Sequence, residues 1–353
     1  MNQNIRFCRS ADGVKLAYAV SGEGPPLVMS ATWLSHLEHQ WQSLAWQPWL
    51  DAFSRDHKLL RYDSRGCGLS DRDAGDFSFE TWVRDFECVI EAASFRRFDL
   101  LATCWGGPVA IEYAARHPER VNRLILYGTY GRGRLARSDR PKEADKARVL
   151  LDLTQLGWGR ENHAFLQVWA SHFQPGGTLE HLRSWCDQQS AATSAETAVR
   201  LLRIGWNSDV TDAARKIRCP VLMLHAERDA VVPIDEGRLL ASLIPDCRFV
   251  PLDSSFVICK TYGAGIECGL HFDIGPGGAR GTLRSFSRMI GRRTNGGHSH
   301  SAGIDGGAWQ VGTFSNLTLE YNHGPSSWTH SFIITHENSK RQMVTIFGGK
   351  WRA

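Results

Sequence analysis

The chain of 353 residues contains no apolar run that approaches the ~18 residues needed to cross a bilayer, so we expect no membrane-spanning segment. Its opening stretch, MNQNIRFCRSADG, has no apolar core of the kind found in secretory signals. The nine cysteines are an odd number, are scattered and include no Cys-x-x-Cys pair. Together these absences predict a cytoplasmic protein whose thiols stay reduced.

A basic run interleaved with aromatic residues is also absent, and the formal charge of +4 is small for this length. We therefore expect neither nucleic acid nor a membrane as a partner. With 42% hydrophobic and 22% charged residues, the chain can bury a large core. Its length fits two domains or one large α/β unit with an insertion.

Strand-like and helix-like segments alternate up to about residue 130, which is typical of βαβ units around a mainly parallel sheet. From about 134 to 210 the pattern changes to successive helices rich in Trp and His, which we interpret as a lid inserted between two strands. The sheet pattern returns over 220–253. The fold class predicted is α/β, with a doubly wound sheet and a helical lid.

The segment DLLATCWGGPVAI, residues 99–111, combines a buried strand, a sharp turn and a helix. Small residues stand two positions before and after Cys104, at Ala102 and Gly106, as such a turn requires. The turn exposes its central side chain and directs helix N-terminal amides toward it, which favours a thiolate. Cys104 is therefore a candidate nucleophile, the alternative being a buried structural cysteine on a tight turn.

Two flanking motifs place this turn in a wider context. RYDSRGCGLSD (61–71) precedes it, and YAARHPERVNRLILYG (113–128) follows it. With these motifs, residues 5–254 resemble the α/β-hydrolase family, in particular the branch often fused to signalling modules such as nucleotide cyclases. The resemblance implies a hydrolase domain over 1–254, with its site at the carboxyl ends of the strands.

The resemblance also implies a triad of nucleophile, histidine and acid. By position, Cys104 is the nucleophile, and the acid is Asp229 in HAERDAVVP, where a turn or helix-capping role is the alternative. The Trp105 amide supplies one oxyanion donor. The second is assigned to the backbone of Trp33, although the family's usual His-Gly pair is absent from that loop.

The histidine of the triad is missing from its expected place. Counting from the last strand puts it near residue 257, where the chain has Val257 in PLDSSFVICK. His225 falls within a strand and is expected to be buried, whereas His36 and His39 stand on the loop near the oxyanion hole. None of these replaces the family's base, so we expect low activity or none.

Beyond about residue 255 the composition shifts toward glycine and histidine, and a polar-tipped hairpin is expected over 328–349. The motif GGHSH (296–300) and its flanks resemble the end of a phage-type calcineurin-like metallophosphoesterase. That resemblance implies His271, His298 and His300 as metal ligands in a small α+β segment, residues 255–353.

The ordered N-terminal ligand clusters of that second family, an Asp-x-His, a Gly-Asp with a later Asp and a Gly-Asn-His, are not present as a set. We therefore expect weak binding of a divalent metal in the tail, if any, and no cofactor in the hydrolase domain. A gene fusion, a frameshift or a chimera would each give this arrangement. The amphipathic stretch 279–292 is predicted to replace the lost final helix on the sheet.

Three functions follow in order of preference. The first is hydrolysis of a small acyl ester or related bond through Cys104. The second is a non-catalytic module that binds a small molecule under the lid. The third is a metal-dependent phosphoesterase that uses the tail histidines. The sequence defines neither the substrate nor the oligomeric state.

Overall fold

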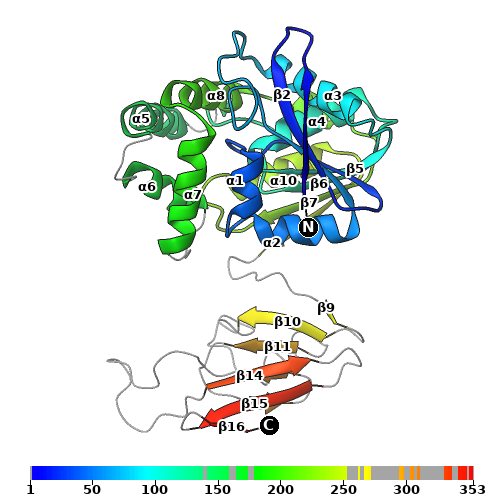
Figure 1. The fold of residues 1–353 in the computed structure, drawn as a ribbon, viewed down its shortest axis with the longest axis vertical. Coiled ribbons are helices and arrows are strands. Elements are labelled where there is room, and N and C mark those ends of the chain that lie inside the picture. The colour runs from blue at the N-terminus through cyan, green and yellow to red at the C-terminus, as the bar shows by residue number, and fades with distance from the viewer. Residues whose placement is uncertain are drawn as a thin grey trace. The chain divides into compact units, whose positions relative to one another are not determined.

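The computed structural model describes residues 2–137, 141–158, 164–173 and 179–252, together with the backbone of eight strands beyond Leu252. The chain divides into two compact units, Met1–Leu252 and Asp253–Ala353 (Figure 1). Val257 and the stretch 279–292, to which the sequence assigns a missing base and a replacement helix, lie outside the described residues.

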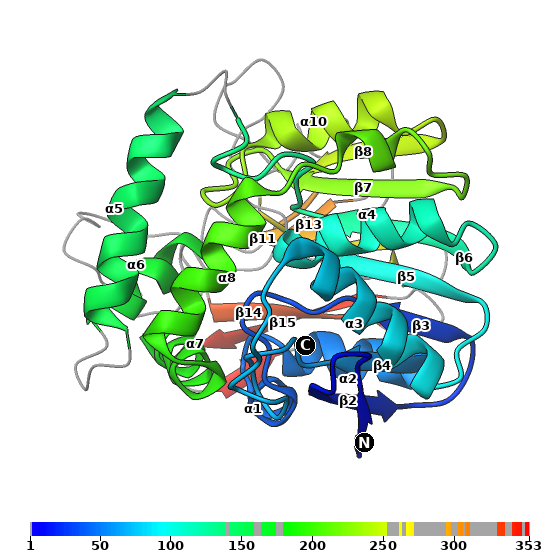
Figure 2. The ribbon, with the colours of Figure 1, turned by 90° about the horizontal axis from the view of Figure 1, so that it is seen from above.

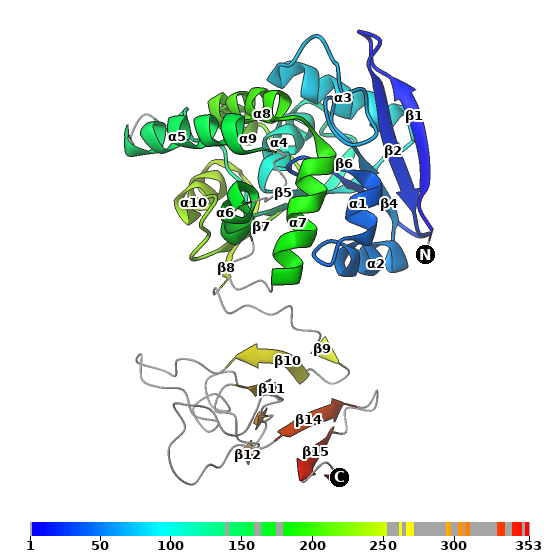
Figure 3. The same cartoon turned by 60° about the vertical axis from the view of Figure 1, so that its left-hand side comes forward.

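An eight-stranded sheet forms the centre of the first unit, in the order β1-β2-β4-β3-β5-β6-β7-β8. The strands are β1 (Asn4–Arg9), β2 (Lys15–Ser21), β3 (Pro26–Met29), β4 (Lys58–Tyr62), β5 (Phe98–Thr103), β6 (Val121–Tyr127), β7 (Val221–Ala226) and β8 (Cys247–Leu252). β2 is antiparallel to β1 and β4, and every other pair is parallel. Figure 3 shows β1 and β2 as a hairpin at one edge. The doubly wound, mainly parallel sheet predicted from the sequence is confirmed.

Helices connect the strands and form the lid. They are α1 (Leu37–Gln42), α2 (Gln47–Asp56), α3 (Phe79–Ala92), α4 (Gly107–Arg116), α5 (Pro141–Gly157), α6 (Ala164–Phe173), α7 (Leu179–Ala192), α8 (Ala195–Asn207), α9 (Thr211–Ala214) and α10 (Ile234–Leu243), with a 3₁₀ turn η1 (Cys104–Gly106). α5 to α8 lie between β6 and β7 in the chain and gather at one end of the strands (Figure 2). This is the predicted lid, although its first helix begins at Pro141 and the described arginine-rich residues 131–137 are not helical.

Both faces of the sheet are covered because its central strands are apolar on both sides. Along β3, Leu27 and Met29 belong to a cluster packed against α2, whereas Val28 between them belongs to the larger core that includes α3 and α4. β5 divides in the same way, with Leu101 in the smaller cluster and Leu100 in the larger one. This alternation is what a parallel sheet buried on both faces requires.

A buried ion pair joins the N-terminal hairpin to the body of the unit. Arg65, 1% exposed, follows β4 and donates to both carboxylate oxygens of Asp85 on α3, at 2.6 and 2.7 Å. It also contacts Asp12, in the turn between β1 and β2, at 2.8 Å, and the carbonyl oxygen of Asp76 at 2.7 Å. One guanidinium thus holds together three segments that are distant in sequence.

The topology brings four loops to one edge of the sheet. Because β3, β5, β6 and β7 are parallel, the segments after Met29, Thr103, Tyr127 and Ala226 all leave the same end of the strands. Ligand sites of open α/β sheets form at this end. The predicted nucleophile, acid and oxyanion loops therefore come from adjoining positions.

The second unit contains a five-stranded sheet, in the order β12-β13-β11-β10-β9, and a three-stranded sheet, β14-β15-β16. Their strands are β9 (Thr261–Tyr262), β10 (Ile266–His271), β11 (Thr294–Gly297), β12 (Gly303–Asp305), β13 (Ala308–Gln310), β14 (His330–Thr335), β15 (Arg341–Phe347) and β16 (Lys350–Arg352). β14 and β15 pair antiparallel, as the hairpin predicted over 328–349 requires. Among the described residues, no helix is long and apolar enough to span a membrane.

Candidate active site

Cys104 stands at the turn between β5 and α4, with a left-handed backbone φ of +40°. A non-glycine residue in this region is strained, and such strain is common at the nucleophile turn of hydrolases. A Cβ at Gly106 would overlap Ser30 Oγ, and one at Gly107 would overlap Thr129 Oγ1. Thr129 also donates a 2.5 Å hydrogen bond to the carbonyl oxygen of Cys104. The sequence GG after Trp105 is therefore a steric requirement of this turn.

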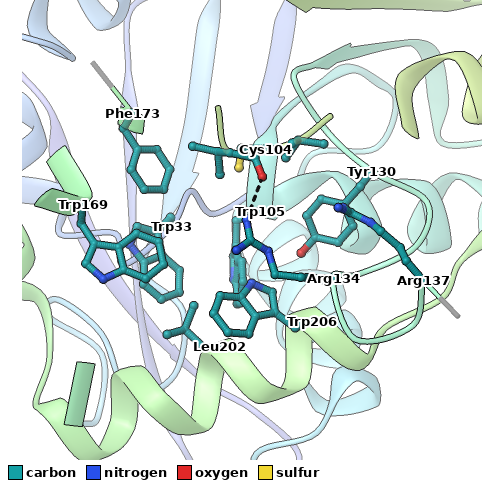
Figure 4. A pocket seen from close by; sticks show the side chains of 12 residues that line it. Trp33, Cys104, Trp105, Tyr130, Arg134, Arg137, Trp169, Phe173, Leu202 and Trp206 are labelled. Carbon is teal, nitrogen blue, oxygen red and sulfur yellow. Dashed lines mark hydrogen bonds between the residues drawn. The ribbon is translucent and has the colours of Figure 1, made fainter. Parts of the chain in front are cut away.

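A pocket of about 450 Å³, including its mouth, opens at this turn (Figure 4). Its described lining residues come from the strand-end loops and from lid helices α6 and α8. They are Trp33, Cys104, Trp105, Tyr130, Arg134, Arg137, Trp169, Phe173, Leu202, Trp206, Val231 and Val232. The walls are mostly aromatic and aliphatic, which is usual for a site that accepts a small organic molecule.

The oxyanion donors named from the sequence lie on this pocket. The amide of Trp105 acts to lower the pKa of the Cys104 thiol, so this amide lies close to the sulfur. Trp33 lies between β3 and α1, and its indole packs against that of Trp105 with ring centroids 4.8 Å apart. Leu34, next to it, has φ +43°, so the loop turns sharply beside the pocket. The Trp33 amide as second donor stays a prediction.

Asp229 follows β7, and its two oxygens have different neighbours. Oδ1 accepts 2.8 Å hydrogen bonds from the amides of Val231 and Val232, which is the turn role considered as an alternative. Oδ2 lies 3.7 Å from Nε2 of His225. Burial raises the pKa of the Asp229 carboxyl above its usual value, and the two amide hydrogen bonds oppose that shift. The carboxylate is thus both a turn residue and a charge next to the site.

The Cys104 thiol is neutral at physiological pH. Burial raises its pKa to about 12, and the negative charge of Asp229 adds to the shift. The Trp105 amide and the guanidinium groups of Arg137 and Arg134 act in the opposite direction but do not outweigh burial. The thiolate that the sequence suggested for this turn is therefore not favoured, because burial of the sulfur and the nearby Asp229 carboxylate both disfavour the negative charge.

Among the described residues, no histidine lines the pocket. His225 is fully buried in β7, as expected, and its Nε2 lies 2.9 Å from the carbonyl oxygen of Val232. His36 caps α1, where its Nδ1 accepts from the His39 amide at 3.5 Å, and burial lowers the His36 pKa to about 4. Neither His36 nor His39 is among the described residues that line the pocket.

The tail histidines are only partly described. His271 ends β10, and the pairing with β11 sets it opposite Gly297, the residue before His298. His298 and His300 lie outside the described residues. No group of three potential metal ligands is found in the described part of the chain. Metal binding by the tail remains a prediction.

Sequence reasoning overlooked Arg134 and Arg137, which supply the charged side chains among the described lining residues. Both belong to GRGRLAR (131–137), in the segment that follows the carboxyl end of β6. A cluster of arginines at this end of a parallel strand was the available signal, because ligand sites form there.

The family of the chain follows from comparison with known proteins. A family model described as alpha/beta hydrolase fold matches residues 38–162. A 2-hydroxy-6-oxo-2,4-heptadienoate hydrolase of Pseudomonas putida is 32% identical over 214 residues, which are 57% of this chain and 72% of that protein. A putative carbamate hydrolase of Azorhizobium caulinodans is 27% identical, covering 67% of this chain and 86% of that protein. The chain belongs to the α/β-hydrolase family.

Two further similarities concern the fold alone or only part of the chain. An esterase of Exiguobacterium antarcticum has the same fold, with a TM-score of 0.60 at 24% identity over 69% of this chain and 89% of that one. Protein A1 of Escherichia phage T5 is 40% identical over 105 residues, or 30% of this chain, and the match spans only 18% of that relative's length. The metallophosphoesterase resemblance and the fusion remain predictions.

The raised pKa of Cys104 predicts how this thiol reacts. We expect alkylation by iodoacetamide, followed peptide by peptide with mass spectrometry, to be slow at about pH 7 and to rise about tenfold per pH unit up to about pH 9. Glutathione, measured in parallel, should begin to level off near about pH 9. An alkylation rate at Cys104 that levels off below about pH 8 would indicate a stabilised thiolate and contradict the raised pKa of this thiol.

Proposed function

We propose that the first unit hydrolyses a small acyl ester, or a related bond, through a thioester on Cys104. The observation that carries the proposal is the strained backbone of Cys104, φ +40°, which presents the sulfur to an aromatic pocket at the carboxyl ends of the strands. Strain of this kind persists where surrounding structure enforces it, and it is common at reactive residues. The strained turn, the nearby Trp105 amide and the neighbouring carboxylate together favour acyl transfer over a purely structural cysteine.

In acylation, the Cys104 thiol gives its proton to the Asp229 carboxylate while the sulfur attacks the carbonyl carbon of the ester. The carbonyl electron pair moves onto oxygen, which accepts hydrogen bonds from the Trp105 amide and, by family resemblance, from the Trp33 amide. Collapse of this intermediate breaks the carbon–oxygen bond. The departing alkoxide takes the proton from Asp229, which leaves a thioester and an alcohol.

In deacylation, water attacks the thioester carbonyl and Asp229 accepts the water proton. Collapse releases the carboxylic acid, and the sulfur takes back the proton from Asp229. Burial raises the pKa of Asp229, which makes its carboxylate a better base than an exposed one. The Cys104 pKa of about 12 still makes the proton transfer strongly uphill, so turnover should be slow.

Replacing Asp229 with asparagine separates the effect of its charge on the Cys104 pKa from its proposed role as proton acceptor. The amide oxygen of asparagine can accept the Val231 and Val232 hydrogen bonds that Oδ1 of Asp229 accepts, so the turn is retained. Removing the negative charge should lower the Cys104 pKa and speed its alkylation about tenfold. Loss of the proton acceptor should slow hydrolysis of 4-nitrophenyl acetate by at least about 100-fold.

Asp212→Asn is the matched control, because Asp212 is exposed on α9 and pairs with Arg215 away from the pocket. It should change neither rate. If Asp229→Asn slowed alkylation and hydrolysis together, Asp229 would be stabilising a cationic base at the site, and the proton route proposed here would be wrong.

A second candidate is a non-catalytic module that binds a small molecule under the lid. It is favoured by the neutral thiol, which has no histidine beside it among the described residues of the pocket. Four tryptophans line the pocket, so quenching of their fluorescence reports occupancy directly. Saturable quenching by esters that the protein never hydrolyses would select this second function over the first.

A further inference from the structure

The pocket beside Cys104 is lined by two positively charged side chains that come from the same loop. Arg134 and Arg137 enter it from the loop between β6 and α5, on the side of Tyr130, whereas Trp33, Trp169 and Phe173 form the opposite side (Figure 4). No acidic side chain is found among the described lining residues. Burying two arginine side chains in an otherwise apolar wall costs free energy unless their charges and N–H groups find partners.

Arg137 is the more deeply buried of the two, at 4% exposure. Its Nε donates to the carbonyl oxygen of Arg132 at 3.0 Å and lies 3.5 Å from Oε1 of Glu236. That carboxylate is already engaged by Arg132, whose Nη2 lies 2.9 Å from the same oxygen. Nη1 of Arg137 is buried and has no hydrogen-bond partner in the described structure. Buried donors of this kind are rarely left unpaired.

Two further buried donors belong to the same pocket. The indole Nε1 atoms of Trp33 and Trp169 are also without a hydrogen-bond partner. Among the described lining residues, the buried polar side-chain atoms without partners are therefore all donors, and no unpartnered acceptor accompanies them. A ligand that satisfies this pocket must bring acceptor oxygens and negative charge.

Arg134 is placed to assist. Its guanidinium stacks over Trp206 at 5.4 Å, forms an ion pair with Glu143 at 3.6 Å, and donates from Nη2 to the carbonyl oxygen of Val231 at 3.4 Å. It is thus held at the pocket wall by contacts that leave its charge next to that of Arg137. Guanidinium groups bind carboxylates through charge-assisted hydrogen bonds, and the apolar walls beside them suit the carbon chain of an organic acid.

We propose that the substrate of this site is an ester whose acyl part ends in a carboxylate, which Arg137 binds with the assistance of Arg134 while Cys104 attacks the ester carbonyl. This inference rests on the proposed function for the choice of ester but not for the anion site itself. The acyl chain between the two groups lies along the aromatic middle of the pocket. The carboxylate supplies the acceptors that Arg137 Nη1 lacks.

The test compares two esters of equal length. 4-Nitrophenyl hemiglutarate carries a terminal carboxylate, whereas 4-nitrophenyl pentanoate ends in a methyl group. The wild-type protein should favour the hemiester by about tenfold or more in kcat/KM, mainly through KM, and Arg137→Met should reduce the ratio to about one. Arg137→Lys, which keeps the charge but loses the planar fork, should give an intermediate ratio.

The ratio of the two rates does not depend on how much of each variant folds, so a partly unfolded variant does not obscure the result. Arg238→Met is the matched control, because Arg238 is exposed on α10 and pairs with Asp235. It should leave the wild-type ratio unchanged. A wild-type ratio at or below one, or a preference that survives Arg137→Met, would overturn the proposal while ester turnover itself still supports the proposed function.

If neither ester is hydrolysed, the anion site is tested by binding of glutarate. Binding is measured as quenching of the fluorescence of the pocket tryptophans. Saturable binding of glutarate, but not of pentanamide, that is lost in Arg137→Met would establish the anion site without the hydrolase activity. Absence of glutarate binding would overturn the inference independently of catalysis.

Discussion

Replacement of Cys104 by alanine is expected to lower kcat/KM for 4-nitrophenyl acetate by about 1000-fold or more, because it removes the sulfur on which we propose that the covalent intermediate forms. Serine at this position should be nearly as inactive. Family members that use serine depend on an imidazole to accept its proton, and no histidine lines the described pocket here. A hydroxyl is far less acidic than the Cys104 thiol, so the Asp229 carboxylate alone cannot activate it.

Cys88→Ser is the control for both variants, because Cys88 lies on α3, where its sulfur contacts that of Cys8 at 3.8 Å, away from the pocket. It should hydrolyse the ester as fast as the unaltered protein. Full activity in Cys104→Ala would eliminate Cys104 as the nucleophile. Higher activity in Cys104→Ser than in the wild type would reveal a base that the described residues do not include.

Replacement of Arg65 by methionine is expected to reduce the free energy of unfolding by about 3–5 kcal/mol, because it leaves Asp85 buried without its counter-ion. Asp85 is 2% exposed and accepts both of its short hydrogen bonds from Arg65. Burial already raises the pKa of Asp85, and loss of Arg65 raises it further. The loss in free energy of unfolding should therefore be smaller at about pH 5 than at about pH 8, because a protonated carboxyl costs less free energy to bury than a carboxylate.

Urea unfolding followed by circular dichroism measures this effect. Arg84→Met provides the comparison, because Arg84 pairs with Glu80 on the exposed surface of α3, and it should cost less than about 1 kcal/mol. A loss in Arg65→Met no larger than in Arg84→Met would mean that the buried network contributes no more than a surface ion pair.

Much of this arrangement could be predicted from local sequence. The alternation of strands and helices defined the sheet, and the small residues around Cys104 defined the turn, because both are consequences of periodicity and close backbone approach. The steric overlap that a Cβ would create at Gly106 and Gly107 confirms why those residues are small. The helical lid was recognised for the same reason, since its periodicity differs from that of the sheet.

The electrostatic state of the site could not be predicted locally. The pKa of Cys104 is raised by burial in the folded pocket and by Asp229, and neither effect is encoded near residue 104. The sequence suggested a thiolate because, of the groups around Cys104, only the amides of the following helix could be inferred from it. Arg137 was missed for a related reason: its unpartnered Nη1 becomes apparent only when Glu236 on α10 is seen to be shared with Arg132.

The covalent intermediate offers the most direct test of the central claim, that the family's acyl-transfer chemistry here proceeds through Cys104. Wild-type protein turning over 4-nitrophenyl acetate is quenched in acid, digested and analysed by mass spectrometry. The account predicts an acetyl group on the peptide that contains Cys104, removable by hydroxylamine and absent from the Cys104→Ala protein. Steady turnover with no acetyl group on that peptide, or with one on a different side chain whose replacement stops the reaction, would contradict it.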